Sequence, residues 1–511
     1  MTQETTTPPP SERRPPGLAQ NPLSWIGGVF AILGFGTTLF LSLLDASSKR
    51  SNPYLGIFAY AVFPAVLVFG LALVAAGMFR ERGRRRGLAG SQLPEYPRID
   101  FNSRRQRRVA GLALAVGVMV IPISAVTSYR AYEVTESVAF CGDACHTTMG
   151  PEKRAHENSA HARVRCVECH VGPGAESYVK AKFSGVRRMY AAMTNTYKRP
   201  IPPPVYTLRS ATETCGECHW NEKFFGSVLK TFTHFGYDEG NSQRQIDLLM
   251  KVGGGNRENG LASGIHWHMN VANELQYIST DEKHQAIPWV SHKDADGRLT
   301  IYTVKEGGLS QVQVAVAEKR HMDCMDCHNR AAHTFNPPDR IMNIALLTGR
   351  VDPSLPFVKQ QGVGALSGKY ATTEEALARI ESTLDSFYKR GYAQVYAAKR
   401  TSIQAAVREI QRLFSQNFSP HMNANWEAYP ENVGHYYSPG CFRCHDGRHF
   451  SSDGRVIRKD CDLCHTTARQ EEKAFVLGVG ARGAAFAHPL DLGDLKDATC
   501  TDCHTGTGIP Q

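Results

Sequence analysis

Every cysteine in this 511-residue chain belongs to one of seven copies of a short motif, in which two cysteines are followed at once by a histidine. In C-x-x-C-H the two thiols can form thioethers to a porphyrin, and the histidine can bind its iron from one side. A single copy could equally be a redox dithiol or half of a zinc site. Seven copies with no cysteine left over argue against disulfides and zinc, because zinc pairs do not require a histidine after each second cysteine.

We therefore predict seven covalently bound c-type haems. The expected thioether cysteines are Cys141, Cys145, Cys166, Cys169, Cys215, Cys218, Cys324, Cys327, Cys441, Cys444, Cys461, Cys464, Cys500 and Cys503. The expected proximal iron ligands are His146, His170, His219, His328, His445, His465 and His504. The first motif has three residues between its cysteines rather than two, so its local geometry must differ.

Each iron has a second axial position, which a further side chain fills or which stays open for chemistry. Thirteen histidines lie outside the motifs, enough to fill this position in almost every haem, as an electron-conducting chain requires. The expected distal ligands are Met149 for the first haem and, elsewhere, His268, His333, His421, His435, His449 and His488. His266 and His321 compete with His268, His161 and His234 are further candidates, and His156, His284 and His292 read as ordinary histidines.

The net charge of +10 does not indicate nucleic-acid binding. Residues 1–130 carry 15 Lys and Arg against 6 Asp and Glu, which leaves a net charge of only +1 for the rest of the chain. The basic surplus therefore concerns membrane topology.

Three apolar segments without internal charges follow the first 20 residues, and each has about the 20 residues that span a lipid bilayer. They are Trp25–Leu44, Tyr54–Phe79 and Val109–Val126, with Pro122 expected to kink or end the third. The first could alternatively be a cleaved signal peptide. Ten arginines between residues 80 and 108 place that loop in the cytoplasm by the positive-inside rule. The N-terminus is then cytoplasmic, and the haem region lies in the periplasm, where c-type cytochromes mature.

The expected fold class is a mainly α and irregular multihaem cytochrome c, with three N-terminal transmembrane helices and a loop-rich haem domain containing a small β-hairpin insertion. Its expected parts are a disordered tail (1–20), a membrane anchor (21–130), a tetrahaem domain (131–340) with an insertion (221–323), a helical spacer (341–420) and a trihaem domain (421–511).

Local patterns predict several elements inside these parts. A helix is expected over Ala175–Asn195, and strands over Ile287–Val290, Leu299–Val304 and Gln311–Val316, the last from its Gln/Val alternation. In the spacer, Thr372 to Glu375 form a capping box for one helix, and Ile403 to Leu413 present the apolar face of a second.

The sequence also resembles a known family. Cys141-x3-Cys-His-x2-Met149, the motifs ending at His170 and His219, and Cys324-Met-Asp-Cys-His-x4-His333, all behind a membrane helix, are similar to the NapC/NirT family of membrane-anchored quinol dehydrogenases. The whole layout looks like the seven-haem inner-membrane cytochromes of metal-respiring bacteria.

The resemblance implies a quinol pocket beside the first haem, with Lys182 hydrogen-bonding the quinol oxygen. Arg187 and Arg188 stand where the family often has an acidic proton acceptor, and Met149 lies one residue further from its motif than the family's methionine.

Three functions are open at this stage. The first is oxidation of membrane quinol with electron delivery to periplasmic cytochromes or terminal reductases. The second is a passive relay subunit of another respiratory complex, docked through the first two spans. The third is a multihaem nitrite or hydroxylamine reductase, which is disfavoured because that chemistry needs an open coordination site.

Overall fold

The computed structural model describes residues 17–47, 62–86, 102–144, 147–172, 175–202, 210–220, 224–254, 264–269, 273–470, 486, 488, 492–493 and 498–507. The chain forms two compact units, which we describe separately. The first comprises Met1–Ser137 and Pro173–Lys182, and the second comprises Val138–Gly172 and Phe183–Gln511.

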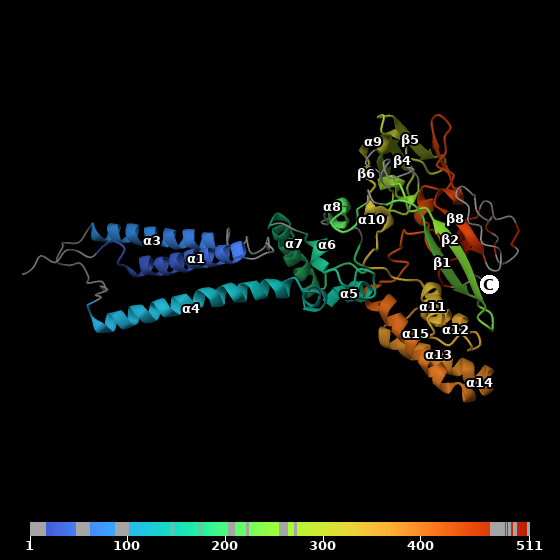
Figure 1. The fold of residues 1–511 in the computed structure, drawn as a ribbon, viewed down its shortest axis with the longest axis horizontal. Helices are drawn as coiled ribbons and strands as arrows, with labels where there is room; N and C mark the ends of the chain where they lie inside the picture. The colour runs from blue at the N-terminus through green and yellow to red at the C-terminus, as the bar shows by residue number, and fades with distance from the viewer. Residues whose placement is uncertain are drawn as a thin grey trace, which may run out of the picture. The chain divides into compact units, whose positions relative to one another are not determined.

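Three long apolar helices dominate the first unit (Figure 1): α1 (Pro22–Ser47), α3 (Phe63–Arg85) and α4 (Arg104–Thr135). Each is long and apolar enough to cross a bilayer, which agrees with the three expected spans. The prediction that Pro122 could end the third helix is wrong, because α4 continues through it to Thr135. A proline removes a single backbone hydrogen bond, whereas a helix that ended within lipid would leave several polar groups unsatisfied.

Glycines bring α1 and α3 into close contact. A Cβ on Gly27 would lie 2.6 Å from the Gly70 carbonyl oxygen, and a Cβ on Gly70 would lie 2.4 Å from the Ala31 nitrogen. Small residues allow this approach, on which membrane helices rely because lipid gives them no hydrophobic drive to associate. The first two spans therefore form a tightly packed pair.

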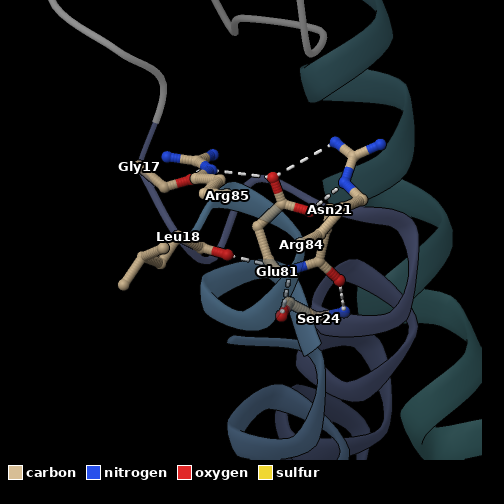
Figure 2. Close-up of polar contacts among 7 residues, drawn as sticks. All are labelled: Gly17, Leu18, Asn21, Ser24, Glu81, Arg84 and Arg85. Atoms are coloured by element: carbon tan, nitrogen blue, oxygen red, sulfur yellow. Dashed lines mark hydrogen bonds and ion pairs between the residues drawn. The ribbon is translucent and has the colours of Figure 1, made fainter. Parts of the chain in front are cut away.

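Polar contacts also lie at one end of this pair, and Figure 2 shows those around Glu81. The Ser24 hydroxyl of α1 donates to the Val74 carbonyl of α3 at 3.0 Å. Glu81, which is 4% exposed, accepts from Arg85 Nε at 2.8 Å and from Arg84 Nε at 3.2 Å. Pairing with two guanidinium groups offsets the cost of burying this carboxylate.

The second unit contains two antiparallel sheets. One has the order β1-β2-β8 and consists of β1 (Val228–Phe235), β2 (Gln243–Met250) and β8 (His465–Gln470). The other has the order β6-β3-β4-β5-β7 and consists of β3 (Glu274–Ile278), β4 (Trp289–Lys293), β5 (Leu299–Val304), β6 (Arg320–His321) and β7 (His449–Ser451). The expected strands near 287–290 and 299–304 are confirmed as β4 and β5, although the sheets are larger than the predicted hairpin.

The strand predicted over Gln311–Val316 is wrong, since these residues form the short helix α9 (Gln311–Val316). Ser310 and Gln313 cap it reciprocally: the Gln313 N–H donates to the Ser310 hydroxyl at 3.3 Å, and the Gln313 side chain accepts from the Ser310 N–H at 2.9 Å. Val312 and Val316 are exposed, so no buried sheet face exists to favour the alternating pattern as a strand.

A bundle of helices forms the largest hydrophobic core. It consists of α11 (Pro338–Leu347), α12 (Val358–Leu366), α13 (Thr373–Gly391), α14 (Ala393–Ala398) and α15 (Arg400–Asn417). The two helices predicted here are confirmed as α13 and α15. The Thr372 hydroxyl accepts from the Glu375 N–H as predicted, but the Glu375 carboxylate accepts from Ala371 rather than from Thr372.

The remaining helical elements are short, apart from α7, which confirms the helix expected over 175–195. They are η3 (Phe140–Ala144), η4 (Thr147–Met149), α5 (Gly150–Glu157), α6 (Cys166–His170), α7 (Ala175–Met193), α8 (Ala211–Cys215), η6 (Ile265–Met269), α10 (Cys324–Cys327), η7 (Pro420–Met422), η8 (Gly440–Arg443), η9 (Cys461–Leu463) and α16 (Cys500–Cys503).

Candidate haem-binding sites

Several C-x-x-C-H motifs fold into the same single helical turn. In four of them the histidine N–H donates to the carbonyl of the first cysteine, at 2.7 Å for His219, 2.8 Å for His328, 3.0 Å for His445 and 2.8 Å for His504. One turn thereby gathers two thiols and an imidazole within five residues, which is the arrangement that thioether attachment and iron ligation need.

The first motif folds differently, in keeping with its extra residue. Phe140–Ala144 (η3) is a π-turn, the wider helical turn that accommodates an inserted residue. Cys145 and His146 lie outside the described residues. Met149 ends the neighbouring η4 and is half-buried, and its role as a ligand stays a prediction.

The other six motif histidines each have a second histidine ring beside them. The ring centres are 6.0 Å apart for His170 and His333, 6.1 Å for His219 and His161, 6.4 Å for His328 and His266, 5.8 Å for His445 and His268, 6.1 Å for His465 and His435, and 6.2 Å for His504 and His488.

This spacing fits an iron between two imidazoles. Metal–imidazole bonds of about 2 Å, with roughly 1.1 Å more from each nitrogen to its ring centre, put two opposed rings about 6.2 Å apart. Direct ring stacking would be closer, as for His435 and Phe442 at 4.3 Å. The residues present therefore fit haem iron at six positions.

Hydrogen bonds select the nitrogen that would face the metal. A carbonyl can only accept, so a ring Nδ1 bonded to one must carry the proton, which leaves Nε2 with its lone pair. Five histidines have Nδ1 within hydrogen-bonding distance of a backbone carbonyl. They are His161 (Ala331, 3.1 Å), His266 (Val252, 2.7 Å), His268 (Ile265, 2.8 Å), His333 (Glu152, 3.0 Å) and His445 (Arg458, 2.8 Å). Metal-binding histidines usually donate their other ring N–H to such a carbonyl, which fixes the orientation of the ring.

Burial further favours the neutral imidazole that a metal requires. It lowers the pKa of His268, His333 and His435 among the distal candidates. The same cause lowers the pKa of the motif residues His445 and His465.

Two of the expected distal ligands have a different setting. His449 is 1% exposed, and both ring nitrogens are occupied, Nδ1 by Asp446 at 2.8 Å and Nε2 by the Ile287 carbonyl at 2.7 Å. His421 is exposed on η7. Within the described parts of the chain, neither ring pairs with the ring of a motif histidine, although His449 is near enough to His445 to contribute to the lowering of its pKa.

The structure also pairs motif histidines with rings that sequence spacing did not favour. His161 and His266 are only further candidates in the sequence, yet each lies beside a motif histidine. His435, which precedes the fifth motif in the sequence, lies beside the histidine of the sixth. No local signal could have found these pairs, because their members come from distant segments. His284 and His292, expected to be ordinary, hydrogen-bond to Tyr277 and Asn273.

Consecutive motifs lie next to one another in space. The thiols of Cys141 and Cys166 are within hydrogen-bonding reach, as are those of Cys215 and Cys324. Further pairs are close enough to interact electrostatically: Cys169 with Cys218, Cys327 with Cys441, Cys441 with Cys464 and Cys461 with Cys500. The seven motifs thus follow one another in sequence order.

The expected quinol ligand, Lys182, lies on α7, and its side chain is outside the described residues.

Comparison with known proteins shows the family to which this chain belongs. Residues 103–200 match the N-terminal region of the NapC/NirT cytochrome c family. The chain is 41% identical over 493 residues to the cytochrome c-type protein ImcH of Geobacter sulfurreducens, a match that covers 96% of each chain. No solved structure matches. The chain therefore belongs to the NapC/NirT family of membrane-anchored multihaem c-type cytochromes, which carry covalently bound haem and transfer electrons.

Proposed function

We propose that this cytochrome oxidises membrane quinol and conducts the electrons through seven haems to periplasmic cytochromes or terminal reductases. The observation that carries the conducting role is the succession of the motifs, because cysteines of consecutive motifs lie near one another from the first motif to the seventh. The quinol role rests on the family resemblance and on the anchor, since α4 ends at Thr135, shortly before Cys141 in the sequence.

In this proposal the fourteen motif cysteines hold the haems, and the motif histidines are the proximal ligands. The distal ligands are His333, His161, His266, His268, His435 and His488 for the second to seventh haems, in that order. A bound haem supplies an iron that takes up and returns one electron. Each histidine pair would hold the iron between its two rings and leave no open site for a small molecule, which favours electron conduction over catalysis at these haems.

At the membrane, Lys182 donates a hydrogen bond to the quinol oxygen, and each quinol loses two electrons and two protons to become quinone. The protons leave on the periplasmic side. The arginine-rich loop of residues 80–108 supports this orientation, because basic loops stay in the cytoplasm. The protein is then an inner-membrane cytochrome with a cytoplasmic N-terminus.

The test is anaerobic stopped-flow mixing of the detergent-purified protein with a reduced menaquinone analogue, followed at the haem α-band. We expect fast reduction in the wild type, at least a tenfold slower reduction in Lys182→Ala, and an unchanged rate in the matched control Lys180→Ala on the same helix. Reduction by dithionite but not by quinol would contradict the proposal and identify the protein as a relay with a protein donor.

A further inference from the structure

A single 3-10 turn in the 221–323 insertion carries two of the paired histidines. This turn, η6 (Ile265–Met269), has the sequence Ile-His-Trp-His-Met. His266 lies 6.4 Å from His328 of the fourth motif with parallel rings, whereas His268 lies 5.8 Å from His445 of the fifth motif with perpendicular rings. A 3-10 helix has three residues per turn, so side chains two positions apart point in different directions. The two rings therefore cannot bind the same metal.

The backbone holds this turn firmly against the end of β2. The Ile265 N–H donates to the Lys251 carbonyl at 2.8 Å, and the His266 N–H donates to the Gly253 carbonyl at 3.0 Å. Gly254 has a φ of +119°, and a Cβ there would lie 2.3 Å from the Trp267 nitrogen. Only glycine fits this close approach.

The residue between the two histidines is also fixed. The Trp267 ring lies 5.0 Å from the His292 ring of β4, and the Asn273 side chain donates to the Trp267 carbonyl at 3.0 Å. The turn therefore joins both sheets of the second unit, through β2 on one side and β4 on the other.

The two motifs that flank this turn are tied to each other independently. Arg443, inside the fifth motif, donates through Nη2 to the carbonyl of Asp326, inside the fourth motif, at 2.6 Å. Asn432 donates to the same carbonyl at 3.0 Å. The fourth and fifth motifs are thus held as neighbours by contacts that do not involve η6.

We propose that the Ile265–Met269 turn supplies the distal ligands of two neighbouring haems, His266 for the fourth and His268 for the fifth. The turn then bridges the NapC/NirT-like tetrahaem part and the trihaem tail. This inference rests on the proposed set of seven haems. Because one residue separates the two ligands, the turn fixes the fourth and fifth haems relative to each other, and electrons enter the tail at this point.

The experiment compares His266→Ala, His268→Ala and the double variant by electron paramagnetic resonance and magnetic circular dichroism of the ferricyanide-oxidised protein. We expect each single variant to lose one low-spin haem signal and to gain one high-spin signal, and the double variant to lose two. Covalent haem content, measured as the pyridine haemochrome, stays unchanged. The matched control is His321→Ala, an exposed histidine of the same insertion, which should alter no signal.

A conservative variant separates ligation from a folding defect. His268→Met should keep a low-spin haem, add one histidine–methionine spectral signature and shift one midpoint potential upward in a dithionite titration, because methionine raises the potential relative to histidine. Retention of every low-spin histidine–histidine signal in His268→Ala, or loss of the same haem signal in both single variants, would overturn the inference.

Stopped-flow reduction by quinol tests the bridge itself. The double variant should reduce its three tail haems at least tenfold more slowly than the wild type does, whereas the control His321→Ala should keep the wild-type rates. An unaltered tail phase would overturn the bridging role. If quinol reduces neither protein, the proposed quinol oxidation fails, whereas the spectra still decide the ligand assignment.

Discussion

The helices of the 341–420 region and the motif-bearing segments of the second unit fold on different principles. The helical region supplies 21 of the 22 residues in the largest buried apolar cluster, among them Ile380, Leu384 and Ile410, none of which is exposed. Between residues 141 and 220, the buried apolar side chains in the described stretches are Pro151, Ala155, Val167 and Ala211. One region has a core of its own side chains, and the other does not.

The difference shows where the haem belongs in the fold. A segment with few buried apolar groups cannot offset the entropy of ordering its backbone. The motif turns instead carry thiols and imidazoles that a porphyrin would join, and the histidine pairs leave the space that one iron needs. We infer that the haems act as the core of the motif-bearing segments.

The largest expected effect comes from removing the haems. Full-length protein produced without haem attachment should keep slow amide exchange in α13 and α15, because their core is made of side chains. The segments around residues 141–170 and 441–465 should exchange at nearly unfolded rates. Hydrogen-exchange mass spectrometry of the haem-free and loaded proteins measures this. If the segments around 141–170 and 441–465 are as well protected from exchange as α13 and α15 in the haem-free chain, the comparison is contradicted.

A buried ion pair marks the boundary between the two regions. Lys359, which is 2% exposed, lies 2.7 Å from Asp339, and Asp339 also accepts from Tyr237 at 2.6 Å and Tyr437 at 2.5 Å. Burial alone would raise the pKa of Asp339, but the Lys359 ammonium and these hydrogen bonds outweigh it and lower that pKa. The Asp339 N–H donates to the Gly506 carbonyl beside the last motif, so the pair connects the core to that motif.

Breaking this pair should have the next largest effect. Lys359→Met leaves a buried carboxylate without its cation, which costs about 3–5 kcal/mol of unfolding free energy. Urea denaturation followed by circular dichroism at 222 nm measures the loss. The double variant Asp339→Asn with Lys359→Met should cost less than the two single variants added together. Strict additivity would mean that the two residues do not interact.

Leu384→Ala tests the helical core alone. Truncating this fully buried side chain should lower the free energy of unfolding by about 2–5 kcal/mol, because apolar burial is lost and a cavity remains. Leu347→Ala, at a 53% exposed position of α11, is the control and should change stability by no more than about 0.5 kcal/mol. The haem spectra should remain those of the wild type under native conditions. A changed low-spin signal in Leu384→Ala would show that core and haem sites are not separable.

The smallest expected effect concerns the turn around Asp281 in the second unit, which is held by hydrogen bonds between its own residues. Asp281 accepts from the N–H groups of Lys283, Gln285 and Ala286 at 3.1, 2.8 and 2.7 Å. Burial would raise the pKa of Asp281, but the hydrogen bonds outweigh it and the pKa is lowered. The stabilisation is therefore present above the unfolded pKa of about 3.9 and is lost as the pH falls through the folded value.

Asp281→Asn should accordingly lower the free energy of unfolding by about 1 kcal/mol at pH 7. The effect is modest because the side chain is partly solvated. The difference from the wild type should shrink at pH 3. Urea midpoints at both pH values measure it, with Asp296→Asn in the next, exposed turn as the control. A difference that persists unchanged at pH 3 would show that the carboxylate charge is not responsible.

Features that depend on local spacing were predictable from the sequence. The motifs, the three apolar spans and helices α7, α13 and α15 follow from cysteine spacing, hydropathy and helical periodicity. Local pattern failed where a stronger local signal competed with it, as the cap of Ser310 did with the Gln/Val alternation of α9.

Only the tertiary structure decided which histidines meet. Sequence spacing favoured His421 and His449, whereas the fold brings His161 and His266 to motif histidines from segments far away in the chain. β8 pairs with β2 across more than two hundred residues, and this pairing sets η6 beside the sixth motif through the hydrogen bond from Lys251 to the Cys464 carbonyl. The expected proximal ligands could be predicted because each directly follows its second cysteine in the chain. The histidine beside each of them could not, because it comes from a separate segment that only the tertiary structure brings close.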